Sequence, residues 1–101
     1  MKICFKDDKE QAFYEDSKAL SVKYGTKTAR MIIRRINELK AAMNPQKLPK
    51  SARFHEHDGK REGLYSVDLD GPRRLILMPL CDCENYWEIT EAQIYEIYNP
   101  H

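Results

Sequence analysis

Along the first seven residues, apolar and polar side chains alternate, and Ile3 and Phe5 fall on one face. An alternation with a period of two predicts a β-strand here. Beyond it, the apolar positions recur every three or four residues, which is the spacing of one helical face. Asp7 or Asp8 can cap this first helix, which we expect to continue to about Tyr24. The inward candidates of that helix are Ala12, Phe13, Ala19, Leu20 and Val22.

Gly25 is placed to end the first helix, because glycine tolerates a positive φ just beyond a helix. Thr26 is expected to cap a second helix, whose apolar residues repeat at helical spacing. These apolar positions are Ala29, Ile32, Ile33, Ile36 and Leu39. The basic residues between them are Lys27, Arg30, Arg34, Arg35 and Lys40. Asn44-Pro45 closes this helix, so the pattern predicts two antiparallel helices joined by a short turn.

The second half of the chain alternates again and predicts a meander of strands. The predicted extended segments are residues 53–57, 64–69, 73–78 and 87–97. Asp58-Gly59 and Asp70-Gly71 are turn dipeptides, and the second is a strong hairpin signal. We therefore predict an α+β sandwich, with an N-terminal strand, a two-helix hairpin and a three- to four-stranded antiparallel meander. The first strand can pair in the middle of the sheet, because a helical-hairpin connection allows it.

The chain has 101 residues, of which 42% are hydrophobic and 33% are charged. This length is typical of one domain, and the composition argues against a disordered chain. No apolar run approaches the ~20 residues that span a bilayer, and the N-terminal strand lacks the apolar region of a secretion signal. We therefore expect a single domain over residues 1–101, located in the cytosol.

Cysteine occurs at three positions, Cys4, Cys81 and Cys83. An odd number without a framework spacing favours reduced thiols over a disulfide scaffold, with Cys4 as a small buried hydrophobic residue. His55-x-His57 and Cys81-x-Cys83 raise the question of zinc, but structural zinc sites usually use Cys pairs with a wider spacing. We therefore expect no metal and no cofactor.

The net charge of +1 conceals an uneven distribution. Residues 1–26 carry five basic and five acidic side chains, and residues 27–74 carry twelve basic and six acidic ones. Residues 75–101 carry five acidic side chains and neither Lys nor Arg. A basic middle section indicates an anionic partner, most commonly nucleic acid. The alternative is a helix surface that presents Lys and Arg only to water.

Histidine is scarce, and two of the three histidines lie in the basic segment from Arg53 to Arg61. In an extended strand, His55 and His57 share one face with Arg53. Cleavage of RNA needs a base for the 2′-hydroxyl, an acid for the leaving oxygen and a cation at the phosphate. Histidine and arginine supply these groups near neutral pH. The alternative for this segment is a solvated polar loop.

Arg73 and Arg74 follow the predicted hairpin turn, so one is expected on each side of the sheet. On the face without helices, such a side chain can reach a phosphate. The alternative is a salt bridge to Asp68 or Asp70. Aromatic side chains of the second half can stack on unpaired bases, although strand aromatics more often serve in packing. These aromatic residues are Tyr65, Tyr86, Trp87, Tyr95 and Tyr98.

Residues 48–75 resemble the corresponding stretch of the HigB branch of the RelE/ParE toxin superfamily. The family pattern there is a Leu-Pro loop, Arg-Leu-His, Gly-Asp-Arg-x-Gly, an aromatic-Ser-Ile strand, Asn-Gly and a strand that begins with Arg. The matching segments are Leu48-Pro49, Arg53-Phe54-His55, Gly59-Lys60-Arg61-Glu62-Gly63, Tyr65-Ser66-Val67, Asp70-Gly71 and Arg74-Leu75. Chain length and the order of elements agree from end to end.

The resemblance implies a RelE-like sandwich and the toxin of a type II toxin–antitoxin system, a ribosome-dependent mRNA endonuclease that inhibits translation. Its implied partners are the ribosome, mRNA and a HigA-like antitoxin with a helix-turn-helix domain. By motif position, His55 matches the family's catalytic histidine and His101 its terminal histidine. Arg61 and Arg74 match basic positions that contact RNA. The further candidates are Arg53, Lys60 and Arg73 for phosphate binding, and His57 and Tyr98 as auxiliary groups.

The C-terminus departs from the family pattern. Family members commonly end in Asp-Tyr-His, whereas this chain ends in Asn99-Pro100-His101. Proline fixes the backbone and removes a hydrogen-bond donor at that position. Two alternatives therefore stay open: a ParE-like toxin that binds DNA gyrase without nuclease chemistry, and an inactive regulator that binds only the antitoxin.

Overall fold

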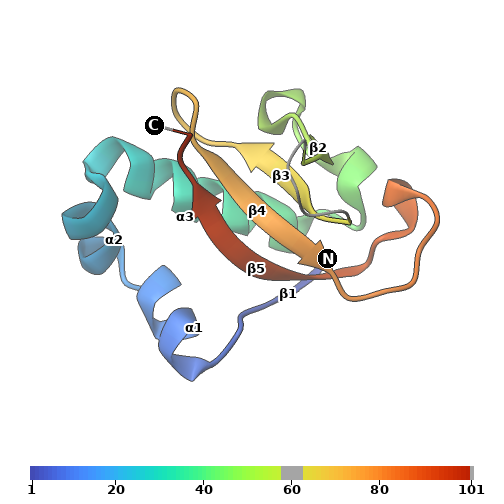
Figure 1. Cartoon of the computed structure of the whole chain (residues 1–101), viewed down its shortest axis with the longest axis horizontal. Coiled ribbons are helices and arrows are strands. Elements are labelled where there is room, and N and C mark those ends of the chain that lie inside the picture. The colour runs from blue at the N-terminus through green and yellow to red at the C-terminus, as the bar shows by residue number, and fades with distance from the viewer. Residues whose placement is uncertain (58–62, 101) are drawn as a thin grey trace.

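The computed structural model describes residues 1–57 and 63–100, which form the α+β structure that the sequence predicts (Figure 1). Its helices are α1 (Asp8–Tyr14), α2 (Ser17–Tyr24) and α3 (Thr26–Ala41). Its strands are β1 (Lys2–Cys4), β2 (His55–Glu56), β3 (Tyr65–Asp68), β4 (Arg74–Pro79) and β5 (Glu91–Tyr98). Short 3₁₀ helices are η1 (Pro45–Lys47), η2 (Lys50–Ala52) and η3 (Tyr86–Glu88). None of the helices in these described ranges is long and apolar enough to cross a membrane.

The strands form one mixed sheet in the order β1-β5-β4-β3-β2. Strands β2 to β5 are antiparallel neighbours, and the predicted Asp70-Gly71 hairpin connects β3 to β4. The prediction that the first strand pairs in the middle of the sheet is wrong, because β1 lies at an edge, parallel to β5. Without β1, the antiparallel meander of β2 to β5 has two outer edges, and β1 pairs with the one formed by β5.

The first helical segment is interrupted at Asp16, where the sequence predicted a single helix. The Asp16 carboxylate accepts hydrogen bonds from the N–H groups of Lys18 and Ala19, each at 3.1 Å, and so begins α2 as its N-cap. The cap of α1 is Asp7, one of the two residues predicted for that role. A second aspartate at the right spacing therefore divides the segment into two short helices.

This interruption changes which residues of α1 and α2 face the core. Leu20 is fully buried as expected, and Phe13 and Ala19 are half-buried. Ala12 and Val22, which were also predicted to point inward, are exposed. The reason is that two short helices set by separate caps do not share one continuous face.

Gly25 ends α2 with a φ of 90°, as its position in the sequence predicted. It also precedes α3 as the N-cap, so Thr26 is the first helical residue and not the cap. The apolar stripe of α3 lies against the sheet and forms the core, with Ile33 only half-buried at its margin. The core residues from α3 and the strands include Ala29, Ile32, Ile36, Leu39, Val67, Leu75, Leu77 and Ile94.

Arg35 is buried, although the sequence placed it among the basic residues between the apolar positions of α3. Its side chain is 4% exposed. The guanidinium donates to Asp68 O at 2.7 Å, to Ser51 O at 2.9 Å and to the Glu38 carboxylate at 2.7 Å. These partners compensate the buried charge and connect α3 to β3 and to the segment before β2.

Two extended segments of the second half are shorter than predicted. β2 contains only His55 and Glu56, because Arg53 adopts a φ of 47°, a left-handed conformation that interrupts an extended strand. The last strand starts at Glu91, because η3 occupies the beginning of the segment that was expected to be extended. The left-handed conformation of Arg53 therefore separates η2 from β2.

Cys81 and Cys83 form a disulfide, which corrects the prediction that all the cysteines are reduced thiols. The turn after β4 brings their Cα atoms to 5.4 Å, a separation usual for disulfides. Cys4 is a free cysteine and is half-buried, not fully buried as expected. A pair separated by one residue carries no framework signal in the sequence, and the local turn decides whether the two thiols meet.

Candidate functional site

His55 occupies the first position of β2, directly opposite Ser66 of β3. Its Nδ1 is in hydrogen-bond contact with the carbonyl oxygen of Arg53, and its Nε2 lies 3.1 Å from the Ser66 hydroxyl oxygen. A carbonyl oxygen only accepts hydrogen bonds, so Nδ1 carries the proton of this contact. In the neutral ring, Nε2 then accepts a hydrogen bond from the Ser66 hydroxyl. Both contacts together fix the ring plane and the tautomer.

The left-handed turn at Arg53 explains the first of these contacts. It ends η2 and directs the Arg53 carbonyl oxygen at the ring of His55, two residues later. A fully extended strand, as the sequence predicted for residues 53–57, would alternate instead and hold the carbonyl away from the ring. The histidine is therefore oriented by its own main chain on one side and by a neighbouring strand on the other.

The polar residues around His55 lie on the sheet face opposite α3. Val67 and Leu75 belong to the core under α3, so the residues adjacent to them in each strand point the other way. On that opposite face, β3 and β4 contribute Ser66, Asp68 and Arg74. We call His55 and these three residues the His55 face.

Asp68 binds two arginines at the His55 face. One carboxylate oxygen contacts the guanidinium of Arg74, its direct neighbour across the β3–β4 ladder. The other oxygen lies 3.2 Å from Nη1 of Arg53, whose side chain is 68% exposed. Two guanidinium groups against one carboxylate leave a net positive charge in this cluster, and such charge attracts anions.

His57 and Tyr98 adjoin the same group of residues. The N–H of His57 donates to Leu64 O at 2.8 Å, which continues the pairing of β2 with β3. The ring of His57 meets the ring of Tyr98 edge to face, with centroids 5.0 Å apart. Tyr98 lies directly opposite Arg74 in the β4–β5 ladder, so both auxiliary candidates lie at the Arg74 side of the His55 face.

Arg73 does not join this group. Its Nη1 lies 3.4 Å from the Asp70 carboxylate in the hairpin turn. Arg73 and Arg74 thus both form the salt bridges that the competing interpretation of the sequence predicted. Four predicted features lie outside the described residues, namely Lys60, Arg61, His101 and the Asp58-Gly59 turn.

The aromatic candidates on the other side of the sheet mainly contact one another. Tyr65 stacks on Phe54 with ring centroids 5.1 Å apart. The ring centroid of Tyr86 lies 5.9 Å from that of Phe54 and 5.3 Å from that of Trp87. Trp87 keeps 45% of its surface exposed, so this cluster combines packing with an open aromatic surface.

In the part of the chain that the structure describes, no three His, Cys, Asp or Glu side chains gather in a geometry that holds a metal ion. Cys81 and Cys83 are bonded to each other, so neither sulfur is a free thiolate that could share a metal with His55 and His57.

Ser66 and Asp68 organise the His55 face, yet sequence reasoning gave neither of them a functional role. From the sequence, Asp68 is indicated only as a salt-bridge partner, and Ser66 only as part of a motif. The available signal was a pair of polar residues two positions apart in a strand whose alternate positions are apolar. Such a pair indicates that the second face of the strand is also committed to specific contacts.

Comparison with protein-family models and with curated proteins finds no match to this chain. The chemistry of the site is therefore inferred from its own residues. A histidine with one nitrogen oriented by the main chain, beside a cationic cluster on the same face, suits an anionic substrate from which a proton is removed.

Proposed function

We propose that this chain is a HigB-like toxin of the RelE/ParE superfamily, the toxin component of a type II toxin–antitoxin system. In this proposal it acts in the cytosol as a ribosome-dependent endoribonuclease that cuts mRNA, and a helix-turn-helix antitoxin of the HigA kind neutralises it. The observation that supports the proposal is the placement of the oriented His55 ring on one sheet face with the Arg53–Asp68–Arg74 cluster. A base beside a cation is what attack of a ribose 2′-hydroxyl on its own phosphate requires.

In the proposed complex with phosphate, one of the two arginines exchanges Asp68 for the phosphate. The Arg53 side chain is mostly exposed and can turn from Asp68 toward a phosphate, where a planar guanidinium binds two oxygens at once. Asp68 then keeps Arg74 in place through its other oxygen. The ribosome positions the message, so the enzyme itself needs few catalytic groups.

His55 is the proposed acid or base. To take a proton, Nε2 exchanges its contact with Ser66 for one with the ribose hydroxyl, while Nδ1 keeps its contact with the Arg53 carbonyl. The retained contact stabilises the charged ring that forms, because a charged donor makes a stronger hydrogen bond. His101 is the proposed partner on the basis of motif position. The supporting groups in this proposal are Lys60, Arg61, His57 and Tyr98.

A second candidate is a non-nuclease member of the same superfamily, either a gyrase-binding toxin or a regulator that binds only the antitoxin. The observation that favours it is that both ring nitrogens of His55 already have partners within the chain. Arg53 and Arg74 are likewise both paired with Asp68.

Induced expression in bacteria without the partner gene, followed by mapping of mRNA 5′ ends, separates the two candidates. The nuclease predicts growth arrest with new ends inside translated codons, and His55→Ala lowers cleavage by roughly 100-fold or more. Glu56→Ala is the matched control, because Glu56 is exposed on the same strand and alternates to the other face. Growth arrest with intact mRNA and damaged DNA favours gyrase binding, and harmless expression favours the regulator.

A further inference from the structure

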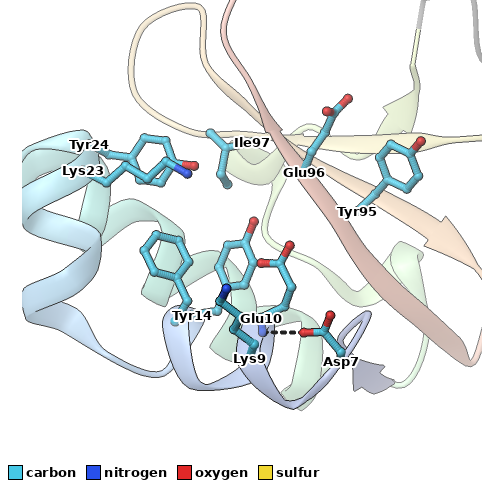
Figure 2. Close-up of a pocket in the computed structure, with 10 residues that line it drawn as sticks. Asp7, Lys9, Glu10, Tyr14, Lys23, Tyr24, Tyr95, Glu96 and Ile97 are labelled. Atoms are coloured by element: carbon cyan, nitrogen blue, oxygen red, sulfur yellow. Dashed lines mark hydrogen bonds between the residues drawn. The ribbon is translucent and has the colours of Figure 1, made fainter.

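A cavity of about 530 Å³ lies between α1, α2 and β5 (Figure 2). Its volume falls within the range of small-molecule sites. None of the residues of the His55 face lines it. Glu10 and Tyr14 rise into this cavity from α1, and Lys23 and Tyr24 reach it from α2.

Tyr14 contributes a polar group to the cavity. The residue is 7% exposed, its hydroxyl points into the space under β5, and among the described residues that hydroxyl has no hydrogen-bond partner. Burial raises the pKa of Tyr14, and the neighbouring Tyr24, Glu10 and Glu96 side chains raise it further. The hydroxyl is therefore neutral and can accept a hydrogen bond in a region of negative potential.

Lys23 shows where a cation sits in this cavity. Its Nζ lies 5.2 Å from the ring centroid of Phe13 and 5.4 Å from that of Tyr24, which are distances of cation–π contacts. Among residues 1–57 and 63–100, no carboxylate oxygen lies within 4.0 Å of this ammonium to form an ion pair. Two aromatic faces therefore hold the charge of a flexible, exposed side chain.

The charges that line the cavity favour a positive ligand. Three carboxylates (Asp7, Glu10 and Glu96) stand against two ammonium groups (Lys9 and Lys23). Over the described residues, the Glu10 carboxylate has no hydrogen bond or ion pair of its own, so it is available to a ligand.

We propose that this cavity binds an organic cation, a guanidinium or a primary ammonium group, which displaces the Lys23 ammonium from the rings of Phe13 and Tyr24. The bound cation pairs with the Glu10 carboxylate and donates a hydrogen bond to the Tyr14 hydroxyl. Aromatic faces suit an organic cation, whereas Ca²⁺ or Mg²⁺ requires a shell of oxygen ligands. This inference does not depend on the function proposed for the His55 face.

Titration of the ¹⁵N-labelled protein with N-acetyl-arginine amide tests the proposal, because this probe carries a guanidinium as its only charge. We expect the amide signals of Phe13, Tyr14 and Tyr24 to shift with saturation. Glu10→Gln removes the charge-assisted contact and weakens binding by about tenfold. Tyr14→Phe, which keeps the ring, weakens it by about threefold. Lys23→Met removes the internal competitor and tightens binding.

Two matched variants separate the site from general electrostatics. Asp8→Asn removes an acid of α1 that does not line the cavity, and Lys18→Met removes a lysine of α2 that does not line it. Both are expected to leave binding unchanged. Equal weakening by Asp8→Asn and Glu10→Gln overturns the proposal, and so does an unchanged spectrum of the Lys23→Met variant at roughly 10 mM probe.

The source of the cation is resolved by two further probes at the same site. Tighter binding of an arginine-containing pentapeptide than of the amide assigns the cation to a protein partner, and tighter binding of spermidine assigns it to a free polyamine. Either result supports the cation site.

Discussion

The Ser66 hydroxyl oxygen lies 3.1 Å from Nε2 of His55, and Ser66 has no exposed surface. The two residues face each other across the β2–β3 ladder, so strand register sets the contact. A one-residue slip of β2 would place His55 on the opposite side of the sheet. Ser66 is therefore a positioning residue for the imidazole of the candidate site.

Ser66→Ala removes this contact and leaves His55 oriented only by the Arg53 carbonyl. We expect cleavage to fall, on the order of tenfold, and the free energy of unfolding to fall by about 1 kcal/mol, the net value of one hydrogen bond. The ¹⁵N chemical shifts of the His55 ring report its contacts, and we expect the Nε2 signal to move in Ser66→Ala while the proton stays on Nδ1, because the Arg53 carbonyl still accepts it. An unchanged ring spectrum in Ser66→Ala contradicts the positioning role.

Asp68→Asn removes the negative charge between Arg53 and Arg74. We expect tighter binding of single-stranded RNA, by several-fold at low salt, because the cationic cluster gains one net charge. Filter binding at several salt concentrations measures the effect, and the salt dependence should become steeper by about one counterion. Asp70→Asn is the control, since it makes the same charge change in the hairpin turn beside Arg73. Equal gains for both variants would show that only net charge matters.

Arg35→Met leaves three polar groups without their buried partner and removes the connection between α3 and β3. We expect a loss of about 3–5 kcal/mol in the free energy of unfolding, the usual effect of breaking a buried charge network. Arg34→Met is the comparison, because Arg34 pairs with Glu38 at 3.2 Å on the exposed side of the helix. That variant should lose no more than about 0.5 kcal/mol. Urea unfolding followed by circular dichroism measures both, and similar losses would contradict the role of Arg35.

Tyr14 makes the free energy of unfolding depend on pH in the alkaline range. Burial and neighbouring negative charge raise the pKa of Tyr14 above its ordinary value of 10.0, so above pH 10 the unfolded chain loses this proton while the folded chain keeps it. The contribution is fully present below pH 10 and is lost as the pH rises beyond it. Urea unfolding at pH 8 and pH 10.5 should show a larger decline for the native protein than for Tyr14→Phe. Tyr98 is exposed, so the Tyr98→Phe variant should behave like the native protein. An equal decline of the free energy of unfolding in all three proteins would contradict the assignment of the effect to Tyr14.

Several elements follow from the sequence because their determinants are local. The helical spacing of Ile32, Ile36 and Leu39 predicts α3, and alternation on both sides of Asp70-Gly71 predicts the β3–β4 hairpin. Each depends on residues within a few positions of one another. The α+β class follows from the order of these elements. The position of Gly25 after α2 is predicted for the same local reason.

The site and the sheet edge depend instead on contacts between distant segments. Arg35 becomes buried because Ser51 and Asp68, 16 and 33 residues away, supply carbonyl oxygens for its guanidinium. β1 pairs with β5, which lies at the other end of the chain. His55 is oriented by Ser66, 11 residues on, only after β2 and β3 come into register.

The sequence by itself therefore determined the class of fold, the main helix, the hairpin and the residue types from which a site can be built. Tertiary structure alone decided which polar groups meet. A hydrogen bond or an ion pair needs a separation of a few ångströms and a defined direction, and neither is encoded in periodicity. The partnerships of His55, Arg53 and Asp68 are set by the turn at Arg53 and the register of two short strands.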